Sequence, residues 1–251
     1  MTNPLAAKLS HFAPLSTEDE AMLDRLCADI RPYRAKRDLI KEGDRPDQVL
    51  LLVEGWACRY KILPDGKRQI MAYLVPGDLC DVHVFILKRM DHSIGLISNA
   101  EVAVIPKNKM LELFEQRPRL AQALWWSTLT DEGVLREWLV NLGQRDAYHR
   151  VAHLLAELWL RLRMVGLTSD GAFDMPATQA DLGDTLGLTP VHVNRILQRL
   201  RRDGLIEHSR GRLHIPDVPR LMAVTKFEPN YLHLDGGRED AAAPGAKREA
   251  A

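Results

Sequence analysis

The spacing of apolar residues changes along the chain, and each change marks a new kind of predicted element. Up to about residue 30, apolar positions such as Met22 and Leu26 recur at helical spacing after Ser16, a suitable N-cap, and predict N-terminal helices. Between residues 31 and 116, short β-rich runs alternate with glycine-containing turn signals. These runs are Val49–Val53, Ala57–Ile62, Gln69–Leu74 and Val102–Ile105. Many short strands at this spacing predict a small antiparallel barrel or roll.

Residues 117–143 have the apolar period of one long helix, whose interior contains one glycine, Gly133. A helix of this length exceeds the usual ~11–12 residues and would protrude from a small roll. We expect it to pair with its copy in a second subunit, because an apolar seam on a protruding helix needs a partner. The alternative is that the stripe packs on its own roll. The predicted dimer seam consists of Leu120, Leu124, Ser127, Asp131, Val134, Trp138 and Leu142.

Two consecutive helix starts, separated by a tight turn, are the strongest local signal in the chain. Thr178, with Asp181 three residues later, forms a capping box for the first helix. Gly187 suits the positive φ that ends this helix. Thr189 caps the second helix, and Pro190 occupies its first position, which favours proline. This pattern predicts a helix-turn-helix within a domain from residue 144 to residue 220.

The second of these helices combines an apolar packing face with a polar and basic face, which suits the major groove of DNA. Six arginines lie between Arg195 and Arg212 against only Asp203 and Glu207, and they supply phosphate contacts. A hairpin entered at Gly204 would form a wing. The alternative is a helical hairpin that only packs. The expected DNA-binding residues are Thr178, Gln179, Thr189, Pro190, Val191, His192, Asn194, Arg195, Gln198, Arg199, Arg210 and Arg212.

Composition narrows the class of protein further. Lys+Arg and Asp+Glu both total 34, so only the local charge indicates nucleic acid. Cys27, Cys58 and Cys80 lie far apart and predict neither a disulfide framework nor a zinc knuckle. We see no export signal and no apolar run of the ~18 residues needed for a membrane, and we expect a cytoplasmic protein. No nucleophile, metalloprotease or phosphate-loop motif supports the rival prediction of an enzyme.

The roll, the long helix and the helix-turn-helix together resemble the cyclic-AMP receptor protein/FNR (Crp/Fnr) family of bacterial transcription regulators. The resemblance covers about Leu26 to Leu221, and its hinge matches residues 145–152. The landmarks in the roll are Lys41-Glu42-Gly43-Asp44, Val53-Glu54-Gly55 and Val75-Pro76-Gly77-Asp78-Leu79. The resemblance implies an α+β fold: an N-terminal antiparallel β-roll of the cyclic-nucleotide-binding type (31–116), a dimerisation helix (117–143) and a C-terminal winged helix-turn-helix (144–220). Residues 221–251 would form a C-terminal extension with a disordered tail.

The same resemblance implies a homodimer on a palindromic operator, with double-stranded DNA and RNA polymerase as partners and no membrane. The family's base-contacting positions fall on Thr189, Pro190, Val191, Asn194 and Arg195. Many members of the family have a glutamate where this chain has Val191, and that glutamate contacts cytosine. The best-known operator sequences of the family are therefore not assumed for this chain.

Relatives that bind cyclic AMP hold its phosphate with a Gly-Glu pair and an Arg-Ser pair. This chain has Asp81-Val82 and Asp91-His92-Ser93 at those places, and Leu135-Arg136 where small hydroxyls would face the base. The resemblance therefore implies a sensor domain that does not bind cyclic AMP, because aspartates repel a phosphate. The residues considered for an effector pocket are Cys80, Asp81, His83, His92, Ser93, Leu135 and Arg136.

No cofactor is required by the sequence. The alternative is a haem- or metal-dependent sensor of the same fold, based on Cys80, Asp81, His83 and His92. A surface histidine or a core cysteine would explain the same residues. His149, His153 and Glu157 recur every four residues and offer a second arrangement with metal-ligand spacing, for which an inter-domain face is the alternative.

Overall fold

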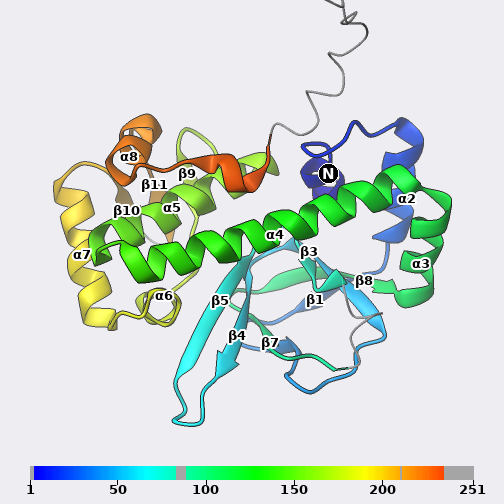
Figure 1. Ribbon diagram of the computed structural model, residues 1–251, viewed down its shortest axis with the longest axis horizontal. Coiled ribbons are helices and arrows are strands. Elements are labelled where there is room, and N and C mark those ends of the chain that lie inside the picture. Colours follow the sequence, from blue (N-terminus) through cyan, green and yellow to red (C-terminus); the bar gives the residue numbers. More distant parts are fainter. Residues whose placement is uncertain (1–2, 83–88, 210, 235–251) are drawn as a thin grey trace, which may run out of the picture.

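The computed structural model describes residues 3–82, 89–209 and 211–234. Figure 1 shows a β-roll crossed by one long helix, with the N-terminal helices at one end of that helix and the C-terminal helices at the other. Within the described residues, no helix is long and apolar enough to span a membrane. The predicted tail, from Gly236 onward, lies outside the described residues.

The roll consists of two four-stranded antiparallel sheets. The first has the order β1 (Ile30–Tyr33), β8 (Ala100–Pro106), β3 (Gln48–Glu54) and β6 (Leu79–Cys80), and the second has β2 (Asp38–Ile40), β7 (Ser93–Leu96), β4 (Ala57–Ile62) and β5 (Arg68–Leu74). Strand β3 is buried from Val49 to Leu52, because its side chains face the roll interior on one side and the helices on the other. The four strands expected from sequence are confirmed.

Two short helices close the N-terminal end of the roll. They are α1 (Pro4–Leu9) and α2 (Thr17–Leu26), and α2 begins with a capping box between Ser16 and Asp19. Leu5 and Leu9 of α1 and Leu23 of α2 are buried in the same core as the roll strands. Helix α3 (Lys107–Gln116) follows β8 and leads into the long helix.

The long helix is α4 (Pro118–Gln144), with 27 residues and a proline in its first turn. A short break at Arg145 separates it from α5 (Ala147–Met164), whose N-cap Asp146 accepts hydrogen bonds from the backbone of Tyr148 and His149. Proline suits a first turn because its missing N–H would be unpaired there in any case. The long helix agrees with the sequence prediction.

The C-terminal part is a winged helix-turn-helix. Its elements are β9 (Ala172–Asp174), α6 (Gln179–Leu186), α7 (Pro190–Arg202), β10 (Glu207–Ser209), β11 (Arg212–His214) and α8 (Val218–Thr225), followed by the 3-10 helix η2 (Pro229–Leu232). The three strands form an antiparallel sheet in the order β10-β11-β9. Its core continues through α5 and the end of α4 to Trp56 and Tyr73 of the roll.

Candidate DNA-binding site

The turn between α6 and α7 forms as its sequence predicts. Thr178 and Asp181 make a complete capping box, and Gly187 ends α6 in the left-handed conformation with φ 64°. The hydroxyl of Thr189 accepts a hydrogen bond from the backbone N–H of His192 at 3.2 Å, and Pro190 is the first residue of α7. These devices start both helices at defined residues.

A second glycine of this unit, Gly183, holds the two helices close together. A Cβ at this position would lie 2.5 Å from the carbonyl oxygen of Leu188 in the turn. Any larger residue would therefore push the turn away from α6. Sequence analysis did not single out this residue, although a glycine inside a helical pattern is a signal of close backbone approach.

Helix α7 buries one face and exposes the other. Val193, Ile196, Leu197 and Leu200 are buried in the domain core. The opposite face is polar and basic, and its exposed apolar residue, Val191, is 64% exposed. Of the twelve predicted DNA-binding residues, ten are exposed, Asn194 is half-buried and Arg210 lies outside the described residues; the exposed ones are Thr178, Gln179, Thr189, Pro190, Val191, His192, Arg195, Gln198, Arg199 and Arg212.

Arg199 differs from its neighbours on this face. Its guanidinium carbon lies 4.4 Å from the centre of the Tyr148 ring, and its Nε lies 3.9 Å from Asp203. The hydroxyl of Tyr148 donates to Asp203 at 2.6 Å. Arg199 thus joins α7 to the first turn of α5, a role that the sequence did not indicate.

Arg150 joins three backbone segments at the hinge. Its guanidinium donates to the carbonyl oxygens of Leu186 at 2.7 Å, Leu142 at 3.0 Å and Arg145 at 3.1 Å. These carbonyls lie at the C-terminal ends of α4 and α6, where unpaired oxygens and the helix dipole favour a cation. The arginine therefore holds the end of the long helix beside the helix-turn-helix.

The roll also contacts the helix-turn-helix directly. Arg68 of β5 donates through Nε to Asp184 at 2.7 Å and through Nη2 to Asp181. The hydroxyls of Tyr73 and Thr185 lie 2.7 Å apart. Burial raises the pKa of Asp181, but the hydrogen bonds from Thr178 and the cation of Arg68 lower it overall below the usual value. Asp181 therefore serves both as a helix cap and as a link between domains.

Most residues of the predicted dimer seam on α4 are buried within their own chain, and they are therefore not exposed to a second subunit. Leu120, Leu124, Ser127, Val134 and Trp138 are all buried, packed against the roll and α5. Asp131 is paired with Arg59 of β4 at 3.2 Å, and Leu142 is half-buried. The alternative, packing of this stripe on its own roll, is the one the structure supports.

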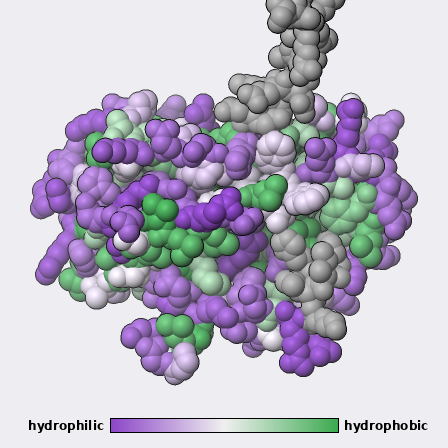
Figure 2. Space-filling model, in the orientation of Figure 1, coloured by the Kyte–Doolittle hydropathy of each residue, from purple (hydrophilic) through white to green (hydrophobic). Residues whose placement is uncertain are grey.

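A different face of α4 is exposed. Its outward residues recur at alternating intervals of three and four, and they include Trp125 at 70% and Leu139 at 71% exposure. The stripe consists of Gln122, Trp125, Leu129, Glu132, Arg136 and Leu139. Figure 2 shows hydrophobic surface along the middle of this side of the molecule.

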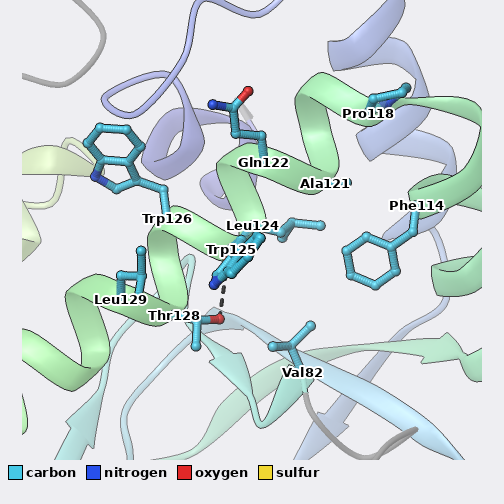
Figure 3. Close-up of a pocket in the computed structure, with 10 residues that line it drawn as sticks. All are labelled: Val82, Phe114, Pro118, Ala121, Gln122, Leu124, Trp125, Trp126, Thr128 and Leu129. Atoms are coloured by element: carbon cyan, nitrogen blue, oxygen red, sulfur yellow. Dashed lines mark hydrogen bonds between the residues drawn. The ribbon is translucent and has the colours of Figure 1, made fainter.

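An apolar groove borders the N-terminal half of this stripe. It has a volume of about 770 Å³ and lies between α3, α4 and Val82. Phe114, Trp125 and Leu129 project toward it from the two helices (Figure 3). The groove contains few polar groups, so it offers a surface for apolar side chains.

The described residues predicted for an effector pocket lie on different elements and differ in burial. Cys80 and Asp81 are buried in the roll, whereas Leu135 and Arg136 are exposed on α4. Of the remaining described residues, His92 precedes β7 and pairs with Asp91 at 2.7 Å. Ser93 begins β7 and accepts a hydrogen bond from the backbone of Glu42. None of these six lines the groove, and His83 lies outside the described residues.

The residues considered as metal ligands also make other contacts. Burial raises the pKa of the Cys80 thiol to about 12, which is typical of a core cysteine. His149 bonds Asp146, whereas Glu157 accepts hydrogen bonds from Trp138. Within the described ranges, no group of three or more His, Cys, Asp or Glu side chains is placed to hold a metal ion.

Comparison with known proteins agrees with this architecture. Family models match residues 30–117, as a cyclic nucleotide-binding domain, and residues 149–224, as a Crp-like helix-turn-helix domain. The transcriptional activatory protein AadR of Rhodopseudomonas palustris is 30% identical over 215 residues, 85% of each chain. The nitrogen fixation regulation protein FixK of Bradyrhizobium diazoefficiens is 32% identical over 195 residues, which cover 76% of this chain and 80% of FixK.

A solved structure adds the three-dimensional likeness. FixK2 from Bradyrhizobium japonicum superposes with a TM-score of 0.69 at 26% identity, over 77% of this chain and 95% of FixK2. The match includes both the roll and the helix-turn-helix that the preceding geometry defines. The chain therefore belongs to the Crp/Fnr family of DNA-binding transcription regulators, which are not enzymes.

Proposed function

We propose that this chain binds a palindromic operator as a homodimer and places α7 of each subunit in the major groove. The exposed, basic face of α7 is the observation that carries the proposal. Arg195 would pair with guanine and Asn194 with adenine, because their side chains match the hydrogen-bonding edges of those bases. Arg212 at the wing would contact a phosphate.

The exposed stripe of α4 supports the homodimer. Its three-four spacing is the heptad pattern by which two helices bury apolar side chains against each other. Trp125, Leu129 and Leu139 would form the apolar contacts, and the groove beside Phe114 would receive side chains from the second copy. A two-fold dimer explains why the operator would be palindromic, since each half-site meets one reading helix.

The sensor domain supports a regulator that acts without cyclic AMP. Arg59 interacts electrostatically with Cys80 and Asp81, and its guanidinium is paired with Asp131 and with the carbonyl of Leu79. A cyclic phosphate would therefore meet the carboxylate of Asp81 without a free partner from Arg59. The regulator would act in the cytoplasm and on RNA polymerase, as transcription from bacterial DNA requires.

The test is a binding titration with duplexes that the wild-type protein selects from a random library. Arg195→Ala should weaken specific binding by about 1–3 kcal/mol per half-site while binding to unrelated duplexes changes little. Arg25→Ala is the control, because it removes the same charge from α2, at the opposite end of the molecule (Figure 1). Added cyclic AMP should leave the curves unchanged.

Equal affinity of the wild type and Arg195→Ala for the selected duplex would refute the assignment of α7. Failure of the wild type to select any duplex would refute the proposed function as a whole.

A further inference from the structure

The chain continues beyond the winged helix and returns to the long helix. After α8 the backbone turns at Lys226, which has a φ of 50°. The following segment, Phe227–Leu234, runs from α8 to α4 and includes η2 (Figure 1). We call this segment the strap.

The strap is anchored by buried side chains. Leu232 is 1% exposed and Phe227 is 6% exposed. The ring of His153 on α5 lies 4.9 Å from the ring of Phe227 and stacks on Tyr231 at 6.3 Å. The strap therefore contributes apolar and aromatic surface to the core of α5.

A buried carboxylate joins the strap to α4. Glu157 of α5 is fully buried and accepts a hydrogen bond from the Tyr231 hydroxyl at 2.9 Å. Both of its oxygens also lie 3.1 Å from Nε1 of Trp138 on α4. Burial raises the pKa of Glu157, and a buried carboxyl group is stable only when it is hydrogen-bonded, so these contacts depend on one another. Tyr231 thus belongs to one hydrogen-bonded group with α4 and α5.

The backbone of the strap packs closely against Gly133 of α4. A Cβ at this position in the middle of α4 would lie 2.6 Å from the carbonyl oxygen of Tyr231. A glycine inside a helix weakens it relative to alanine, so the residue needs a separate explanation. Close approach of the strap backbone supplies that explanation.

We propose that the strap positions the DNA-reading domain on the dimer helix, with Gly133 as its seat and Tyr231 as a positioning residue. The short break at Arg145 between α4 and α5 is one connection between the two parts. The strap is a second connection, so that the DNA-reading domain contacts α4 at both its N-terminal and its C-terminal end. This proposal rests on the proposed function, because two reading helices in a dimer must keep a fixed spacing to fit both half-sites.

The first test compares Gly133→Ala with Gly143→Ala. Both substitutions put the better helix former into α4, but a Cβ at Gly143 would meet no atom of another described segment within 4 Å. Gly133→Ala should displace the strap, lower the melting temperature and speed trypsin cleavage after the exposed Lys226. Gly143→Ala should do neither. If the two variants melt and are cleaved alike, the strap is not docked and the proposal fails.

The second test measures DNA binding on two duplexes selected by the wild type, one with both half-sites and one with a single half-site. If displacement reduces the correctly placed arrangement to about a tenth, affinity for the full site falls roughly tenfold. Affinity for the single half-site should not change, because one α7 helix binds it and no spacing between two helices is required. Equal losses on both duplexes would show general destabilisation and overturn the positioning role.

Tyr231→Ala tests the same contact from the strap. Combined with Gly133→Ala, Tyr231→Ala should lower the affinity for the full site little further, because the strap is already displaced. Additive losses of affinity would show that the two residues act independently, which would contradict the proposal. If the wild type selects no DNA at all, the proposed function fails, whereas the melting and trypsin measurements still decide whether the strap is docked.

Discussion

At the scale of single residues, Asp78 connects three parts of the chain that are distant in sequence. Its carboxylate accepts from Lys8 of α1 at 2.7 Å, from Arg161 of α5 at 2.8 Å and from the backbone of Val75 at 2.8 Å. Burial raises its pKa, but the two cations outweigh burial and hold the pKa at about 2. The ionised form is therefore part of the folded structure.

This pairing predicts a pH dependence of stability. Because the folded pKa of Asp78 is about 2, below its ordinary 3.8, its contribution is complete above about pH 4 and is lost as the pH falls toward 2. Asp78→Asn should be less stable than the wild type at pH 7. About 2 kcal/mol of the difference in unfolding free energy should disappear between pH 4 and pH 2. Denaturant unfolding at several pH values measures it, and a difference independent of pH would contradict the assignment.

At the scale of elements, α4 has two stripes with the same three-four spacing, and they have different roles. The stripe through Leu124 and Trp138 packs on the roll and α5. The stripe through Trp125 and Leu139 is left at the surface. Glutamate in place of Trp138 would put a second carboxylate beside buried Glu157 and would unfold the chain rather than separate subunits.

Leu139→Glu should therefore weaken the dimer without disturbing the subunit. Leu139 is 71% exposed, so the substitution leaves the core intact, while a carboxylate at a heptad position opposes helix pairing. The dimer dissociation constant should rise at least tenfold, about 1.4 kcal/mol, by sedimentation or light scattering. Leu167→Glu is the control at a residue that is 47% exposed outside α4. An unchanged dimer in Leu139→Glu would place the interface elsewhere.

At the scale of the whole molecule, the reading domain is held at several points around the roll and α4. Arg150 contacts the hinge, the strap packs against Gly133 in the middle of α4, and Arg68 of the β4–β5 hairpin contacts α6. All three contacts include hydrogen bonds from polar side chains. These contacts give the winged helix-turn-helix one defined orientation relative to α4, and they leave the polar face of α7 exposed.

Arg68→Ala should loosen α6 from the roll. The guanidinium is one third exposed and contacts two aspartates, so we expect a loss of about 1 kcal/mol in stability. Amide hydrogen exchange should become faster in α6 but not in α2. Lys67→Ala is the control, because Lys67 is an exposed neighbour whose ammonium pairs with Asp65 of the same hairpin. Equal protection of α6 in both variants would show that the Arg68 contact is not formed in solution.

Much of the helix-turn-helix was predictable from the sequence, because the residues that define its caps and turn lie close together in the chain. The caps at Thr178 and Thr189, the turn at Gly187 and the polar face of α7 each depend on residues within one or two turns. The contacts of Arg68 and Arg199 were not predictable in this way. A long cation on a surface element has many partners within reach, and only the packed arrangement selects one of them.

The sequence by itself determined four strands of the roll, the long helix and the starts of α6 and α7, since hydrophobic period, capping residues and turn glycines act over a few residues. Only the tertiary structure decided which stripe of α4 is buried. It also decided that Asp181 pairs with Arg68 of the roll as well as capping α6, and that the strap packs against Gly133. The period of a helix is the same for either stripe, so its choice depends on which surfaces the roll and α5 bring against it. Long-range packing provides that information, and local sequence does not.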